Sequence, residues 1–286
     1  MNIFFKNETE AEDYLAKVGK ENDNEIDVMN VAFALSYLDN PQTLINKYQE
    51  KIAGEEKALG DVFFDLCAKE NSDSVFVQAR ALKEVMADQL GYIGDDVHYD
   101  DLKNINLFSV MDRRMGLPIV LCLVAIHMCR AQGWNAHGVN FPGHFIMRLE
   151  KNGERVMIDP FQSCKILEAK DMRLILKRIM GEYAELSSDY YAPCTNRDMI
   201  LRLQNNLKYR FIDAEKYDSA LLVVHRMALI APNDHRLNLD KAVLYSRVEQ
   251  PLAAIENLEI YIDRVDDDFD KAEAEEFLIQ LRLQLN

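Results

Sequence analysis

The residues whose types and spacing could do chemistry lie in one central stretch. His144 follows a Pro142–Gly143 dipeptide, and Asp159 ends an apolar segment that begins after Asn152–Gly153. Asn-Gly between two such segments predicts a β-hairpin with a two-residue turn. The register that follows sets these residues opposite one another: Lys151 and Glu154, Glu150 and Arg155, Leu149 and Val156, Met147 and Ile158, Ile146 and Asp159.

This register brings a histidine and a carboxylate together. Side chains alternate along a strand, so His144 shares a face with Asp159. The two are diagonal neighbours, with backbones roughly 7 Å apart, which is within reach of a hydrogen bond. A carboxylate that holds one ring nitrogen of a histidine is the orienting half of a nucleophile–His–Asp triad. We therefore predict a His144–Asp159 hydrogen bond.

A triad of the papain type also needs a thiolate at the start of a central helix, where the helix dipole lowers its pKa. The apolar run from Pro118 to Gln132, with Gly133 after it, predicts such a buried helix. Its first positions, Leu117 to Val120, contain no nucleophile. Cys122 lies about one turn further on and has the spacing of a core residue. Cys164 follows Asp159 by five positions and is the alternative, a displaced nucleophile in a loop.

Two metal-binding alternatives arise from the same region. His137, His144 and Asp159 reach the ligand count of a catalytic zinc site, but the predicted His144–Asp159 bond uses the same atoms. The acidic segment from Asp95 to Asp101 lacks the alternation and closing glutamate of a calcium loop, so we expect a solvated loop. We predict no metal and no cofactor, and leave the cis or trans state of Phe141–Pro142 open.

The elements around this stretch are expected to be mainly helical. Apolar recurrence predicts helices over 9–18, 25–38, 59–68, 72–90 and 166–181, and another that starts after Pro41 with Leu44 facing inward. With the hairpin, this makes an α+β chain with a small antiparallel sheet. We expect three regions: N-terminal helices over 1–90, the core over 91–195, and helical hairpins over 196–286.

The last region contains an internal repeat of period 34. The packing residues of its first copy recur in the second, and the small residues Ala220 and Ala254 occupy the same place in each. A small residue there lets two helices approach closely, as tetratricopeptide repeats require. The full sets are Leu207, Phe211, Ala220, Val224 and Pro232, then Lys241, Tyr245, Ala254, Leu258 and Asp266.

Composition narrows the function classes. The 286 residues carry a net charge of -15, which disfavours binding to nucleic acid or anionic membranes. No apolar run is long enough to span a membrane, and the N-terminus lacks a secretory signal pattern. The five cysteines are scattered, as in a cytoplasmic protein with free thiols. The oligomeric state is left open.

Three short motifs resemble a known family. They are Arg-x-Met-Gly-Leu-Pro at 113–118, Pro-Gly-His-Phe at 142–145 and Ile-Asp-Pro-Phe at 158–161. They are similar to the transglutaminase-like core of bacterial SirB-type proteins, which also carry C-terminal tetratricopeptide-like repeats. The resemblance implies a transglutaminase/papain-like core and a Cys–His–Asp site. His144 and Asp159 match the last two members, but the cysteine position falls near Pro118 to Val120.

We therefore predict a pseudoenzyme that acts as a protein- or peptide-binding scaffold or regulator, with a partner in the repeat groove. The alternative is a cysteine-dependent protease or amide-transfer enzyme, in which Cys122 or Cys164 works with His144 and Asp159.

Overall fold

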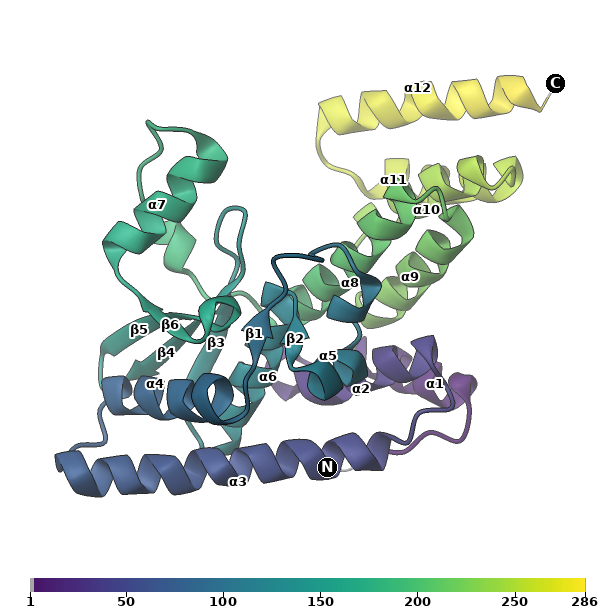
Figure 1. Cartoon of the computed structure of the whole chain (residues 1–286). Helices are drawn as coiled ribbons and strands as arrows, with labels where there is room; N and C mark the ends of the chain where they lie inside the picture. The colour runs from purple at the N-terminus through teal and green to yellow at the C-terminus, as the bar shows by residue number, and fades with distance from the viewer. Residues whose placement is uncertain (1–2, 286) are drawn as a thin grey trace. The chain divides into compact units, whose positions relative to one another are not determined.

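The computed structural model describes residues 3–285, and the chain folds into two compact units (Figure 1). The first comprises the described residues up to Ala11 together with Asp23–Leu203. The second comprises Glu12–Asn22 and the described residues from Gln204 onward. The fold is α+β and mainly helical, as predicted. The finer boundaries at 90 and 195 stay predictions.

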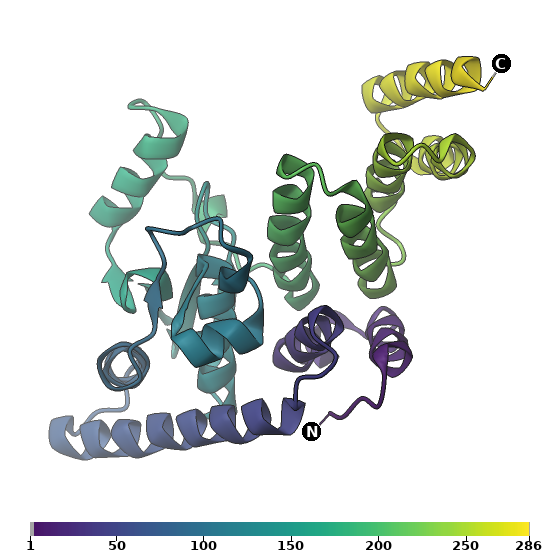
Figure 2. The same ribbon diagram turned by 45° about the vertical axis from the view of Figure 1, so that its right-hand side comes forward.

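Helix α6 (Pro118–Ala131) is the centre of the first unit. Eleven of its side chains are buried, which explains why apolar residues occur almost all around it. Pro118 occupies its first turn, where no N–H is needed. The helix packs against strands β3 (Asn135–Val139) and β4 (Ile146–Lys151) and against helix α3 (Ile45–Glu70). Helix α4 (Val75–Lys83) lies next to α3 in Figure 1 and crosses it at an angle in Figure 2.

The sheet beside α6 has the order β3-β4-β5-β6, with every pair antiparallel. Strand β5 (Glu154–Asp159) pairs with β4 in the register predicted from Asn152–Gly153. The prediction of a helix starting at 166 was wrong. Strand β6 (Lys165–Leu167) extends the sheet, and helix α7 (Ala169–Met180) begins only after a capping box between Glu168 and Asp171.

The N-terminal helices differ from expectation in three places. Helix α2 (Val28–Asp39) starts at Val28, because the Asp27 side chain caps the N–H groups of Met29 and Asn30. Helix α3 is one continuous helix. Leu44 is its extended N-cap and is 71% exposed, so its predicted inward position was wrong. Beyond α4 the chain forms one π-helical stretch, Glu84–Gln89.

A short parallel pair was not predicted. Strands β1 (Ile93–Gly94) and β2 (Met115–Gly116) join on either side of a 3-10 turn (Leu102–Asn104) and helix α5 (Leu107–Arg113). The prediction of a solvated acidic loop was wrong for Asp95, which is 1% exposed. Its carboxylate accepts from the His98 N–H at 2.9 Å and from Arg113 at 3.0 Å. These contacts lower the pKa of Asp95, the His98 hydrogen bond most.

The second unit is built from helical hairpins. Its helices are α9 (Tyr217–Ile230), α10 (Arg236–Arg247), α11 (Pro251–Arg264) and α12 (Asp268–Gln284), with the parts of α1 (Glu8–Val18) and α8 (Asn196–Asp213) that belong to it. Ala220 and Ala254 are fully buried, as the repeat predicts. Among residues 3–285, no helix is both long and apolar enough to cross a membrane.

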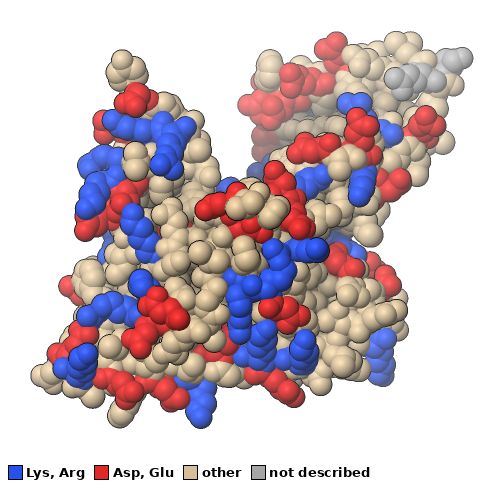
Figure 3. Space-filling model, viewed as in Figure 1, with Lys and Arg blue, Asp and Glu red and all other residues tan. Residues whose placement is uncertain are grey.

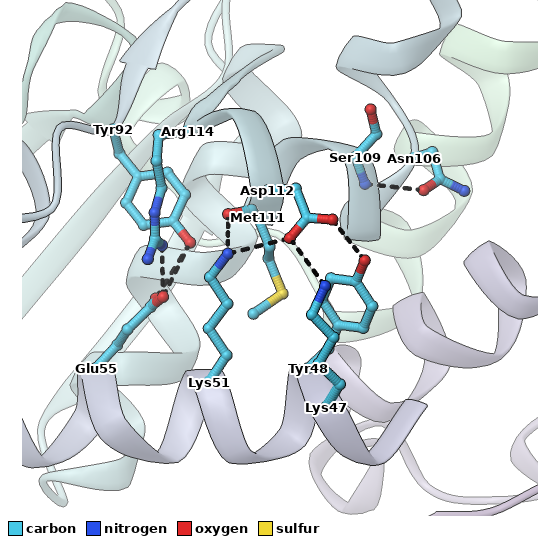
Figure 4. Close-up of polar contacts among 10 residues, drawn as sticks. All are labelled: Lys47, Tyr48, Lys51, Glu55, Tyr92, Asn106, Ser109, Met111, Asp112 and Arg114. Carbon is cyan, nitrogen blue, oxygen red and sulfur yellow. Dashed lines mark hydrogen bonds and ion pairs between the residues drawn. The ribbon is translucent and has the colours of Figure 1, made fainter. Parts of the chain in front are cut away.

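Polar contacts fasten α3 to the segment before α6 (Figure 4). The Arg114 guanidinium donates to Glu55 Oε1 at 2.5 Å and lies over the Tyr92 ring. The Tyr92 hydroxyl donates to Glu55 Oε2 at 3.1 Å, and Glu55 is 3% exposed. Burial first, then Glu55, raises the pKa of Tyr92. One and two turns earlier along α3, Lys51 and Tyr48 respectively bind Asp112.

We expect Arg114→Met to destabilise the first unit by about 3 kcal/mol, because it leaves the Glu55 carboxylate buried without its cation. Met at this left-handed position is as strained as Arg, so the change isolates the charge. The control is Lys47→Met, which removes an exposed pair with Asp112 and should cost at most about 0.5 kcal/mol.

Urea unfolding followed by the fluorescence of Trp134 measures both, because this single tryptophan is buried in the first unit. Equal shifts of the midpoint in the two variants would contradict the prediction.

Candidate active site

The structure brings His144 and Asp159 together as predicted. His144 Nε2 lies 2.8 Å from Asp159 Oδ2, and Asp159 is fully buried. The other carboxylate oxygen, Oδ1, accepts the backbone N–H of Phe161 at 3.0 Å. Both oxygens of Asp159 are therefore engaged, which fixes the orientation of the carboxylate and, through it, of the imidazole.

One aromatic ring borders His144, and the glycine before it packs closely against α7. Phe161 meets the His144 ring edge to face at 6.1 Å, and Tyr99 meets Phe161 in the same way at 6.0 Å. Gly143, the residue before His144, has a φ of 67°, and a Cβ there would lie 2.5 Å from Ile179 of α7. Only glycine fits this turn. The His144 ring thus packs against Phe161, and the turn before it packs against the end of α7.

The two thiols near this pair are buried, and their surroundings favour the protonated, uncharged form. The Cys122 thiol lies 3.5 Å from the Phe145 carbonyl, to which it donates, and Cys122 is fully buried. Burial, and next Asp159, raises its pKa well above that of a free thiol. Cys164 is also fully buried, and burial with the Asp159 charge raises its pKa to about 12. The environment of both thiols disfavours the thiolate.

The start of α6 holds no sulfur. Leu117, Ile119 and Val120 are buried there, and the Leu117 N–H donates to the Asn104 carbonyl at 3.0 Å. The helix dipole therefore faces apolar side chains instead of a nucleophile. Chemically, the site can orient an imidazole and accept a proton, but no ionisable nucleophile accompanies it at the first turn.

The structure does not assemble the alternative metal site. Within the described part of the chain, no group of three or more His, Cys, Asp or Glu side chains could hold a metal ion. His137 Nε2 lies 2.7 Å from Asn135 Oδ1. His137 lines a separate cavity of about 550 Å³, together with Arg130, Cys194, Asn196 and residues of the 23–28 segment.

The residues that support the site were not predicted from the sequence. Arg113 and Arg114 belong to the first motif but were given no role, and their partners Asp95 and Glu55 were not identified. Two adjacent arginines directly before Met-Gly-Leu-Pro were the available signal. Phe161, the ring against His144, lies in the third motif.

The repeats carry two pockets that share Phe277. One, of about 460 Å³, is lined by Val243, Ser246, Arg247, Phe277 and Leu281. The other, of about 170 Å³, is lined by Leu239, Tyr261, Asp270, Glu273, Ala274 and Phe277. The first pocket includes the cation Arg247, and the second includes the acids Asp270 and Glu273. Both pockets lie between α10 and α12, except for the contribution of Tyr261 from α11.

The fold and this dyad define a transglutaminase-like protein. Residues 41–205, more than half of the chain, match the transglutaminase-like superfamily, and residues 207–280 match the tetratricopeptide repeat. The chain belongs to the transglutaminase-like superfamily, in the SirB-type form with C-terminal repeats. Tetratricopeptide repeats generally mediate protein–protein interaction.

The relatives include bacterial proteins named UPF0162. A UPF0162 protein of Xylella fastidiosa (strain Temecula1) is 28% identical over 64% of this chain, and the match covers 66% of that protein. A UPF0162 protein of Vibrio cholerae is 24% identical over 86% of this chain and 90% of its own. Human F-box only protein 21 is 33% identical, but over 44% of this chain and 20% of that protein.

We predict that iodoacetamide leaves Cys122, Cys129 and Cys164 unmodified at pH 8, while Cys67, which is partly exposed, reacts slowly. A raised pKa leaves less thiolate at any given pH. A thiol with a pKa near 12 is thiolate in about one molecule in ten thousand at pH 8. Mass spectrometry of native and urea-unfolded protein locates each modified residue.

The control is His144→Ala, which should give the same pattern. Rapid alkylation of Cys122 or Cys164 at pH 6–7 that disappears in His144→Ala would contradict the prediction.

Proposed function

We propose that this protein is a scaffold that binds other proteins and that its transglutaminase-like core does not catalyse a reaction. The observation that carries the proposal is the start of α6, where Leu117, Pro118, Ile119 and Val120 replace a reactive thiol. The high pKa of the Cys164 thiol and its burial add support. A pair of His144 and Asp159 without a nucleophile serves to fix the backbone around it.

The groove of the repeats is the proposed site for a partner. An extended peptide could place an apolar side chain against Val243 and Phe277 in the larger pocket. A negative group of the peptide would then lie at Arg247, and a positive group at Asp270 and Glu273. Apolar anchors with polar groups at both ends fix the direction of a bound segment. We place the protein in the cytoplasm, which its free cysteines support.

The alternative is a cysteine-dependent protease or amide-transfer enzyme with Cys164 as a displaced nucleophile. One observation favours it. Ser163 and Cys164 both have left-handed backbones, with φ of 52° and 54°. Two adjacent residues in this region store about 1–3 kcal/mol each. Relaxation of this turn would move Cys164, which is now buried, relative to His144.

A peptide panel separates the two proposals. We expect purified protein to neither hydrolyse nor cross-link glutamine- and lysine-containing peptides above the buffer rate, because no thiolate is available. Liquid chromatography with mass spectrometry detects either product. Turnover that is lost in Cys164→Ser or Cys122→Ser, and also in His144→Asn, would replace the scaffold proposal with the enzyme alternative.

A second test addresses the groove. Val243→Glu places a charge in the larger pocket, and we expect it to remove most proteins captured from a cell lysate by the immobilised chain. Leu252→Glu is the matched control, because Leu252 is 72% exposed on α11 and does not line either pocket. Circular dichroism confirms folding of both. Equal capture by the two variants would place binding outside the groove.

A further inference from the structure

Helix α7 is basic, whereas the protein as a whole is acidic. The chain carries 48 acidic residues against 33 lysines and arginines. Within α7, however, there are four cations, Lys170, Arg173, Lys177 and Arg178, and the single acid Asp171. Figure 3 shows Lys and Arg gathered over this helix at the upper left. This basic surface is therefore a local feature on an acidic protein.

Among the described residues, three of these cations have no acidic partner. Lys170 forms an ion pair with Glu168 at 2.9 Å, and Asp171 forms one with Lys165 at 2.8 Å. Throughout residues 3–285, no Asp or Glu pairs with Arg173, Lys177 or Arg178, although acids outnumber bases. No ion pair within the described fold neutralises these three charges, so they can attract an anionic group of another molecule.

Apolar side chains accompany these cations. Met172 and Leu176 hold α7 to a core cluster with Phe141 and Ile146. The opposite face exposes Leu174 to 57% and Met180 to 56%. Residues three or four apart are neighbours on a helix, so Leu174 lies beside Lys177 and Arg178, and Met180 beside Lys177. The free cations and the exposed apolar residues form one surface.

We propose that this surface, formed by Arg173, Leu174, Lys177, Arg178 and Met180, docks an acidic amphipathic segment of a partner protein. Glutamates or aspartates of the segment pair with the three cations, and its apolar side chains cover Leu174 and Met180. The inference rests on the proposed scaffold function but uses a different surface from the repeat groove.

Charge and burial favour a protein segment over a membrane or a nucleic acid. Both of those present extended negative surfaces, which a net charge of -15 repels. A short acidic segment interacts mainly within the screening length of about 8 Å, where the local cations dominate. A helix that binds in a membrane interface also buries its whole apolar face there. Here Met172 and Leu176 are already committed to the core.

The test uses a defined probe and the whole 286-residue chain. The probe is a fluorescent 18-residue helical peptide with leucines at helical spacing and glutamates between them, and fluorescence anisotropy measures its Kd. Lys177→Glu with Arg178→Glu should weaken binding about tenfold or more, because attraction becomes repulsion. Lys57→Glu with Lys69→Glu is the control on α3, with the same change of net charge and no expected effect.

Three results would overturn the inference. The first is equal weakening by both double variants, which indicates attraction to net charge alone. The second is equal binding of a peptide with lysines in place of the glutamates. The third is binding to phosphatidylserine vesicles that Lys177→Glu with Arg178→Glu abolishes, while the glutamate peptide does not bind. Val243→Glu should leave peptide binding unchanged, so failure at α7 is distinguishable from failure at the groove.

Discussion

Two adjacent arginines, each neutralised by a different buried carboxylate, position the segment from which α6 begins. Arg113 reaches Asp95 and the Asn104 side chain, both at 3.0 Å, while Arg114 reaches Glu55 on α3. The two side chains diverge because Arg114 ends α5 in the left-handed conformation, with φ of 60°. A buried charge that loses its partner is costly. The arginines thus fasten β1, α3 and the β2–α6 turn to one another.

The candidate site depends on this arrangement through α6. The helix packs against β4 and against the turn that follows Asp159, and its Cys122 thiol contacts the Phe145 carbonyl next to His144. Gly94, in the strand before Asp95, leaves room for Phe161, whose ring a Cβ at that position would approach to 2.4 Å. The ring that borders His144 is therefore placed by the same segment that Arg113 holds. The position of the site follows from contacts that lie outside it.

This dependence explains what could be predicted from the sequence. The hairpin register needs only the Asn152–Gly153 turn and the alternation of neighbouring residues, so the His144–Asp159 contact was found. The repeat was found because its period is in the sequence itself. Burial of Asp95 was missed because its partner Arg113 is 18 positions away, and Glu55 lies 59 positions from Arg114. Strand β6 was not predicted because its three residues form a strand only by pairing with the free edge of β5, which lies earlier in the chain.

The His144–Asp159 pair has a structural role that does not require catalysis. Asp159 accepts the Phe161 N–H as well as the His144 ring, so it caps the 3-10 turn Pro160–Gln162 while it holds the histidine. Its carboxylate is fully buried, and removal of either partner would leave one oxygen unsatisfied. The thiol of a triad makes no comparable contribution to the fold, because an apolar side chain can occupy its position at the start of a helix. A nucleophile can therefore be absent from such a site while the orienting pair stays under a stability constraint.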